Sequence, residues 1–418
     1  MVEKSKRPVV IGYDAISPLG VDLNEQWRRA LQGQSGIGRL TRFEPAGDFP
    51  VHIAGQAPDI DHLPYPFLKP REQARWVSPI FKYALLTVSR ALNHSGLEIT
   101  PALAPRVAVT YSSAVGGLDV VLDADRRLRA SGALPMPYIN PNACINMVTG
   151  KVAMLTGATG PITSTISACA TGVVSMIVGA MLMALDRADV AICGAVDFAL
   201  VEPIVAGFAT MNGAFVPKEG APDEPPSTAS RPFSIHRRGF VISEGAGCIV
   251  LATEDFARAH GLDYRTALAG WSTSSDAFHF VAPRLETVQR CIQESIDHAG
   301  ISPRAIDAVN AHAAATRVGD KVESDALAGV FGDAVPPVTA NKSLIGHAMG
   351  AASAIESVFA LEGMNAGMLP PTINYKADPE IRIDCVPGAC RSVDQTFVLK
   401  NAFGFGGCNA CVVFERLA

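Results

Sequence analysis

A cysteine set between small residues is the first feature of this chain that could do covalent chemistry. Cys169 lies in the stretch STISACATG, residues 164–172, after an extended segment and before a long apolar one. At a helix N-terminus, backbone N–H groups and the helix dipole favour a thiolate over a thiol. Cys169 is therefore a candidate nucleophile. The alternative is a small buried cysteine that only fills space in the core.

Two histidines could assist such a nucleophile. His312 follows an apolar segment, residues 306–311, and precedes three alanines, where a solvated histidine has no obvious reason to be. His347 lies in a turn of small residues, and Lys342 comes shortly before it. Either histidine alone could be an ordinary core or surface residue. Their placement after strand-like segments favours a site assembled from several strand ends.

The elements that must position these residues follow a repeated order. Around Cys169 the pattern predicts a strand over 161–168, a helix over 172–186 and a strand over 189–196. Ligands favour the carboxyl edge of a parallel sheet, which is where this cysteine would lie. Strands over 305–311 and 338–342 then lead to His312 and Lys342. We expect two similar α/β halves, residues 1–265 and 266–418, around a shared core.

Composition excludes several classes of function. The chain has 418 residues, of which 48% are hydrophobic and 18% charged, and a formal net charge of -5, so it is globular and has no basic excess for nucleic acid or anionic membranes. Its most apolar run, residues 173–185, is only 13 long and suits a buried helix better than a membrane span. No signal-peptide pattern opens the sequence, which predicts a cytoplasmic protein.

The cysteines do not suggest a disulfide framework or a metal site. Nine are scattered through the chain, an odd number, so reduced thiols are expected. Cys408 and Cys411 have C-x-x-C spacing, but no second pair or nearby histidine completes a zinc set. We therefore expect no metal.

Five motifs together resemble the β-ketoacyl-acyl-carrier-protein synthases of the ketosynthase II type, which are thiolase-fold condensing enzymes. In chain order they are the cysteine stretch at 164–172, RPFSIHRRGFVISEGAG at 231–247, NAHAAATRVGD at 310–320, NKSLIGHAMGAA at 341–352 and NAFGFGGCNA at 401–410. The resemblance implies an α/β thiolase fold, with two pseudo-duplicated halves in a five-layer α-β-α-β-α sandwich.

The resemblance also implies an activity and roles for the residues. Cys169 would take an acyl group from acyl-carrier protein and then undergo decarboxylative Claisen condensation with malonyl-carrier protein, in fatty-acid or type II polyketide biosynthesis. His312 and His347 would stabilise the enolate left by decarboxylation. The backbone N–H groups of Cys169 and Phe405 would form an oxyanion hole, with Phe405 also gating the acyl pocket. Lys342 would be structural and electrostatic, with Glu323 as its ion-pair partner.

Substrate and partner contacts are implied in the same way. No cofactor is expected beyond the phosphopantetheine arm of the carrier protein, which Thr316 would help to hold. The acidic carrier would dock on a basic cluster made of Lys69, Arg71 and Arg75, for which an ordinary solvated surface is the alternative. The protein would form a homodimer, or a heterodimer with a chain-length-factor-like subunit. We expect residues 141–149 in the interface and residues 111–136 along the acyl pocket.

Departures from the family pattern suggest a specialised synthase. Ala314 stands where the family usually has the first of two threonines that hold the arm, and the loss of one hydrogen bond weakens the grip by ~0.5–1.5 kcal/mol. The usual aspartate, aspartate, glycine and threonine are replaced at four other positions, namely Ser234, Arg238, Ser243 and Cys408.

Two other functions compete with the condensing enzyme. A non-catalytic, chain-length-setting subunit would generally lack the cysteine, which this chain keeps together with both histidines and Lys342. A thiolase would use coenzyme A and a second catalytic cysteine near the C-terminus; Cys408 points that way, and the NKSLIGH motif points against it. Acyl chain length, saturation and the pathway remain open.

Overall fold

A nine-stranded sheet runs through the protein and joins its two halves. The computed structural model describes residues 6–45, 47–217 and 224–417. In spatial order the strands are β4 (Val107–Val109), β5 (Val190–Phe198), β6 (Glu244–Thr253), β1 (Pro8–Ile16), β7 (Thr266–Ser275), β13 (Cys408–Arg416), β12 (Phe397–Gly404), β8 (Ala308–Asn310) and β9 (Val338–Thr339). The halves meet at β1 and β7, which share only two residue pairs.

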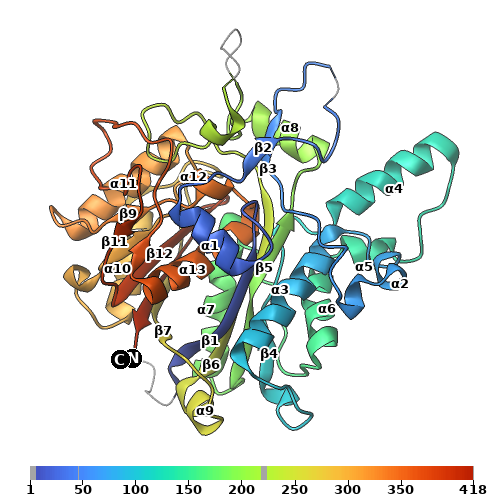
Figure 1. Cartoon of the computed structure of the whole chain (residues 1–418), viewed down its shortest axis with the longest axis horizontal. Helices are drawn as coiled ribbons and strands as arrows, with labels where there is room; N and C mark the ends of the chain where they lie inside the picture. The colour runs from blue at the N-terminus through green and yellow to red at the C-terminus, as the bar shows by residue number, and fades with distance from the viewer. Residues whose placement is uncertain (1–5, 46, 218–223, 418) are drawn as a thin grey trace.

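Helices form three layers around this sheet. The middle layer contains α7 (Thr171–Ala184) and α13 (Met349–Ala366), which contact strands of both halves. On the outer face of the first half, α3 (Pro79–Ser95) packs on β1, β5 and β6, and α6 (Asn146–Thr156) packs on α3. On the second half, α10 (Leu285–His298) covers β7 and β13, and α11 (Arg317–Phe331) packs on α10 (Figure 1). The predicted five-layer arrangement is therefore present.

The sequence explains which helices are central. α7 carries no charged side chain, and an all-apolar helix is stable only when it is buried on every side. Its Met176 and Ile177 belong to one apolar cluster with Ile355 of α13 and with strand residues of both halves, such as Ile249 and Val412. Two further clusters lie beneath the outer helices of each half. The three clusters correspond to the three helical layers.

The remaining elements are shorter or peripheral. They are α1 (Leu23–Leu31), α2 (Pro70–Gln73), α4 (Leu118–Ser131), α5 (Ile139–Ala143), α8 (Glu202–Thr210), α9 (Glu254–Ala259), α12 (Lys342–Ile345) and the strand pairs β2 (Ile37–Arg39) with β3 (Ile53–Gly55) and β10 (Met368–Leu369) with β11 (Arg391–Ser392). Helix α4 stands away from the body of the molecule (Figure 1). Within the described part of the chain, no helix is long and apolar enough to cross a bilayer.

One predicted strand is wrong. Residues 161–168 were expected to pair in the sheet before Cys169, yet they form only a single bridge, between Ile162 and Val109. Residues 163–167 have no regular secondary structure and no strand neighbour among the described residues. The flanking predictions are confirmed, because 172–186 corresponds to α7 and 189–196 to β5.

Candidate active site

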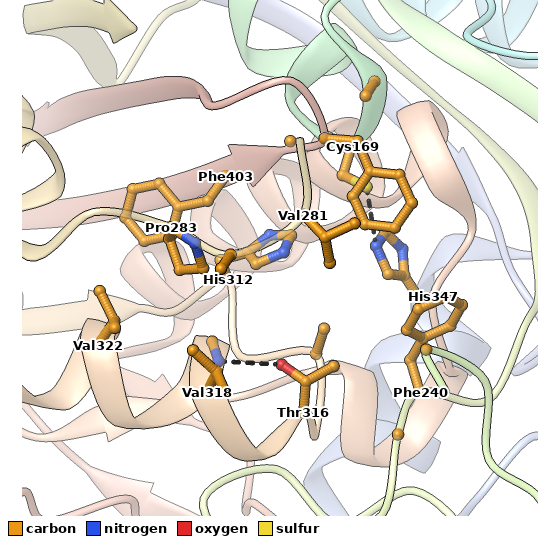
Figure 2. Close-up of a pocket in the computed structure, with 18 of the residues that line it drawn as sticks. Cys169, Phe240, Val281, Pro283, His312, Thr316, Val318, Val322, His347 and Phe403 are labelled. Atoms are coloured by element: carbon orange, nitrogen blue, oxygen red, sulfur yellow. Dashed lines mark hydrogen bonds between the residues drawn. The ribbon is translucent and has the colours of Figure 1, made fainter. Parts of the chain in front are cut away.

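A cavity of about 580 Å³ brings the predicted residues of both halves together. Cys169 enters it from the start of α7, and His312 and His347 come from the turns that follow β8 and α12 (Figure 2). Most of the wall is apolar, with Phe208, Phe240 and Phe403 among the contributors. Apolar walls of this kind lower the local dielectric and strengthen electrostatic interactions inside the cavity.

Cys169 is held by a tight turn rather than by a strand end. The turn is a short 3-10 helix, Ala168–Ala170, and Ala168 has a positive φ of 47°. The Thr171 hydroxyl fixes it by accepting from the Ser167 N–H at 3.0 Å and donating to the Ala168 carbonyl at 2.7 Å. At Gly172, a Cβ would lie 2.4 Å from the backbone nitrogen of Ala354, so α7 and α13 can approach closely only because this residue is glycine. The small residues of the motif thus position the thiol.

The thiol touches one imidazole. Cys169 Sγ lies 3.1 Å from His347 Nε2, and the side chain is buried (Figure 2). Burial raises the pKa of the Cys169 thiol to about 12, and this outweighs the lowering by the Lys342 charge and by the backbone N–H groups of Phe405 and Cys169. The expectation that the helix N-terminus holds a thiolate is therefore wrong for the resting site. Cys169 rests as a thiol, because desolvation is the larger effect.

Both histidines are neutral; His347 is buried and His312 is half-buried. Their rings lie 5.6 Å apart at 82°, and each contacts an aromatic edge: Phe240 against His347 and Phe403 against His312. Burial, together with the Lys342 charge, lowers the pKa of both imidazoles well below the usual range. Neither Nδ1 atom has a hydrogen-bond partner among the described residues. A neutral imidazole still carries one N–H, so each ring can donate one hydrogen bond into the cavity.

The predicted ion pair between Lys342 and Glu323 is wrong. Lys342 Nζ donates to Glu356 Oε1 at 2.6 Å and to the carbonyl of His312 at 2.5 Å. Glu356 lies on α13, the helix between the two halves, and it also accepts from Lys400 Nζ at 2.7 Å. Lys342, the first residue of α12, is therefore paired with a carboxylate of the central helical layer.

Glu323 instead accepts hydrogen bonds from the backbone of the turn that follows β8 and carries His312. Its carboxylate accepts from the backbone N–H of His312 at 2.9 Å and of Ala313 at 2.7 Å, and from Asn401 Nδ2 at 3.0 Å. Ala313 has a positive φ of 22°, so this turn belongs to no helix or strand that could satisfy those N–H groups. Glu323 consequently fixes the backbone that carries His312, which agrees with a supporting role.

Phe405 lies at the tip of the turn between β12 and β13. Its backbone N–H and that of Cys169 both act on the thiol and lower its pKa. The ring is 5.8 Å from that of Phe208 and lines the cavity. At Gly404 a Cβ would lie 2.5 Å from the Ser167 carbonyl, so the turn can reach the nucleophile only with glycine there.

Thr316 and Ala314 line the same cavity. The Thr316 hydroxyl accepts from the Gly319 N–H at 3.2 Å and so caps α11, which leaves its O–H proton available for donation (Figure 2). Ala314 packs with Phe240 and Met349 in an apolar cluster and offers no polar atom from its side chain. At Ala314 the cavity wall therefore lacks the hydroxyl donor that the family pattern has at this position.

Other predicted residues lie outside the cavity. Lys69 and Arg71 are exposed around α2, and Arg75 lies 3.8 Å from Glu72 and over the ring of Tyr138. Of residues 111–136, only Ala114 and Val115 line the cavity. Cys408 is half-buried and Cys411 is buried, both with free thiols. The described residues contain no group of three or more His, Cys, Asp or Glu side chains placed to hold a metal.

Several site residues were not predicted. Lys400 and Glu356 complete the ionic network, and each is a charged residue inside an apolar segment, which is a signal that the sequence displays. Other lining residues have no sequence pattern that would have identified them; they include Phe208 and Met211 of the α8 region, Val281 and Pro283.

A buried thiol hydrogen-bonded to an imidazole, between two α/β halves, defines a class of enzymes that form covalent cysteine intermediates. Family models narrow the class: the β-ketoacyl synthase N-terminal domain matches residues 6–257 and the C-terminal domain matches residues 266–376. The chain belongs to the β-ketoacyl synthase family.

Relatives and solved structures agree over nearly the full length. The chain is 32% identical to 3-oxoacyl-(acyl-carrier-protein) synthase 2 of Staphylococcus aureus over 99% of both chains, and 33% identical to the protein of that name from Coxiella burnetii, also over 99% of both. A β-ketoacyl synthase from Burkholderia phymatum superposes with a TM-score of 0.90 at 27% identity, over 99% of this chain and 100% of that one. A chain from a complex of a type II polyketide synthase acyl carrier protein with its ketosynthase has a TM-score of 0.88 at 25% identity, over 99% of both chains. These matches confirm the predicted family and thiolase-fold class.

Proposed function

We propose that this protein is a β-ketoacyl-acyl-carrier-protein synthase that elongates an acyl chain by two carbons. The observation that carries the proposal is the Cys169 Sγ to His347 Nε2 contact of 3.1 Å, in a cavity that His312 and the Phe405 backbone also line. The function divides into two steps, acyl transfer to the cysteine and decarboxylative condensation.

In the first step Cys169 attacks the thioester carbonyl of acyl-carrier protein. The thiol loses its proton as the carbon–sulfur bond forms, and His347 Nε2 is the nearest base. The tetrahedral oxyanion accepts from the backbone N–H groups of Phe405 and Cys169, which already act on the sulfur in the resting site. Each donor of this kind contributes about 3–4 kcal/mol to lowering the barrier. The pantetheine thiolate leaves, takes from His347 the proton that came from Cys169, and departs with its carrier.

In the second step malonyl-carrier protein occupies the emptied arm site. Its carboxylate leaves as carbon dioxide, and the electron pair of the broken bond forms an enolate. Because the imidazoles of His312 and His347 are neutral, each can donate an N–H to the enolate oxygen without a competing charge. The enolate carbon attacks the acyl-cysteine, and the Cys169 sulfur leaves as a thiolate that takes up one proton from solvent to restore the thiol. A β-ketoacyl thioester two carbons longer remains on the carrier.

The arm-carried thioesters require no other cofactor in this scheme. A solved neighbour is described as a ketosynthase with its acyl carrier protein, which supports such a carrier as the partner here. We include a cytoplasmic location in the proposal.

For the carrier we propose docking on the basic cluster of Lys69, Arg71 and Arg75. Lys69 and Arg71 are exposed and make no ion pair among the described residues, so both remain available to an acidic surface. Reversal of both to glutamate should raise the KM for carrier-bound substrate and leave reaction with small thioesters unchanged. An unchanged KM for the carrier-bound substrate would exclude this surface.

A second subunit is also part of the proposal. Four large apolar side chains that follow α5 along the chain are exposed: Met154, Leu155, Ile162 and Ile166. A homodimer, or a heterodimer with a chain-length-factor-like subunit, would cover them, with residues 141–149 expected at the same interface. A neighbour described as a ketosynthase/chain length factor supports the second form. The retained thiol and histidines favour the catalytic role over that of the chain-length-setting subunit.

Reconstitution with acyl- and malonyl-carrier protein tests the function. The expected product is a β-ketoacyl-carrier protein two carbons longer than the acyl donor, and the Cys169→Ala variant should form none. Glu362→Gln, a change on α13 away from the cavity, is the matched control and should retain turnover. If the wild-type protein gives no product, alone or with a partner subunit, the proposed function is wrong.

A further inference from the structure

Arg238 places a guanidinium in the wall of the active-site cavity. It lies on the approach to β6 and lines the cavity together with Gly239 and Phe240. Its side chain is 16% exposed, so most of it is removed from solvent. The guanidinium carbon stands 4.9 Å from the ring centre of Phe215, a cation–π contact that holds the group in place.

The hydrogen-bonding capacity of this side chain is largely unused. Arg238 Nη2 donates to Glu224 Oε2 at 3.0 Å, but Nε is buried and has no acceptor among the described residues. A guanidinium has five N–H donors, and burial of an unpaired one is costly. Arg238, a residue of the cavity wall, therefore has at least one N–H, on Nε, that lacks an acceptor among the described residues.

Among the described residues, the charge around Glu224 is also unbalanced. Glu224 Oε2 accepts from Arg231 Nη2 at 2.6 Å as well as from Arg238, so two guanidinium groups share one carboxylate. Their sum is one net positive charge. Arg231 does not line the cavity, whereas Arg238 does. An electron-rich oxygen that enters the cavity would meet the excess charge at Arg238.

Arg238 adjoins the wall segment that has one hydroxyl fewer than the family pattern. The N–H of Gly239, the next residue, donates to the carbonyl of Ala315 at 2.9 Å, between Ala314 and Thr316. Thr316 can donate one hydrogen bond to a molecule in the cavity, and Ala314 can donate none from its side chain. Arg238 is thus positioned on the same side of the cavity as the Thr316 donor.

We propose that Arg238 donates a hydrogen bond to an oxygen of the phosphopantetheine arm, either an amide carbonyl or the phosphate, and so supplies a donor that Ala314 lacks. The inference rests on the proposed function, because it takes the carrier's arm as the ligand. It makes Arg238 a substrate-binding residue at a position where the resemblance leads one to expect an aspartate, which could not donate when ionised. The alternative is a purely structural role, in which Arg238 only forms the ion pair with Glu224.

Protection of Cys169 from iodoacetamide tests the inference without requiring acyl transfer. The probes are S-methylated N-acetylcysteamine, S-methylated pantetheine and S-methylated 4′-phosphopantetheine, which carry one amide, two amides and two amides with a phosphate. Each is titrated against the wild-type protein, Arg238→Met, Arg238→Lys and Arg231→Met. The half-protecting concentration is measured by intact mass. Arg231→Met removes the other partner of Glu224 and is therefore the control for the clamp.

The expected result is a loss of affinity that depends on arm length. Arg238→Met should raise the half-protecting concentration about tenfold for every probe that contains the oxygen bound by Arg238. Shorter probes, which lack that oxygen, should protect the variant and the wild type equally. The probe at which the loss begins distinguishes an amide from the phosphate. Arg238→Lys should lose less, and Arg231→Met should match wild type.

Two results would overturn the inference. One is equal protection of Arg238→Met and wild type by every probe, and the other is the same loss in Arg231→Met. Failure of the proposed function would look different, because the wild-type protein would then form no acyl-enzyme even though the arms still protect Cys169.

Discussion

Glu356 is the single carboxylate that two fully buried lysines share, which makes its removal a sharp test of the site's electrostatics. In Glu356→Gln, the Lys342 and Lys400 ammonium groups, now 2.6 Å and 2.7 Å from carboxylate oxygens, would face a neutral amide. An amide oxygen can accept from one lysine, and the amide nitrogen would then point its donors at the other. Two buried positive charges would lose their counter-charge at once.

The expected loss of stability follows from the burial of all three groups. Removal of one partner of a buried ion pair destabilises a protein by about 3–5 kcal/mol. In a chain of this length, 1 kcal/mol corresponds to roughly 1 °C, so we expect Tm to fall by about 3–6 °C. Because Lys342 also holds the His312 carbonyl, turnover should fall with it. Differential scanning calorimetry and a condensation assay at a permissive temperature measure the two effects.

Two variants separate charge from packing. Glu362→Gln makes the same change on the same helix, where the carboxylate accepts from the Tyr13 hydroxyl at 2.7 Å, and should lower Tm by no more than about 2 °C. Lys400→Met should offset part of the Glu356→Gln loss in the double variant, because it removes one of the two uncompensated charges. Equal Tm values for Glu356→Gln and Glu362→Gln would refute the reasoning.

The remaining predictions concern pH. Since burial raises the pKa of Cys169 to about 12, its thiolate fraction grows with pH, and the rate of alkylation by iodoacetamide should rise about tenfold per pH unit from pH 7 to 10; a plateau below pH 9 would contradict this. Burial likewise raises the pKa of Asp14 to about 8, so its contribution to stability is present below the unfolded-state pKa of about 4 and is lost as pH rises through 8. The Tm of Asp14→Asn relative to wild type should therefore be several degrees higher at pH 9 than at pH 5. A Tm difference that does not change with pH would show that Asp14 does not titrate in this range.

The residues that do the chemistry were predictable because each lies in a short local motif. Cys169, His312 and His347 are carried by turns of small residues, and the structure brings all three into one cavity. The central position of α7 was equally visible, since a helix with no charged side chain must be buried.

Ion-pair partners and strand pairing depend on how distant segments pack together, so they were not predictable from local motifs. Lys342 could pair with a carboxylate from α11 or from α13, and only the placement of α13 between the two halves decides for Glu356. The residues before Cys169 carry a strand-like pattern, but a strand also needs a neighbour to pair with. Desolvation of the thiol depends on the whole cavity, so the sequence suggested a thiolate where burial favours a thiol.

The measurement that tests the central claim most directly is the mass of the protein after incubation with acyl-carrier protein alone. Wild-type protein should gain the mass of one acyl group, located on the peptide that contains Cys169, and should lose it again when malonyl-carrier protein is added. Cys169→Ala should gain nothing. An acyl group on another residue, or an adduct that malonyl-carrier protein does not discharge, would contradict a mechanism in which Cys169 carries the chain.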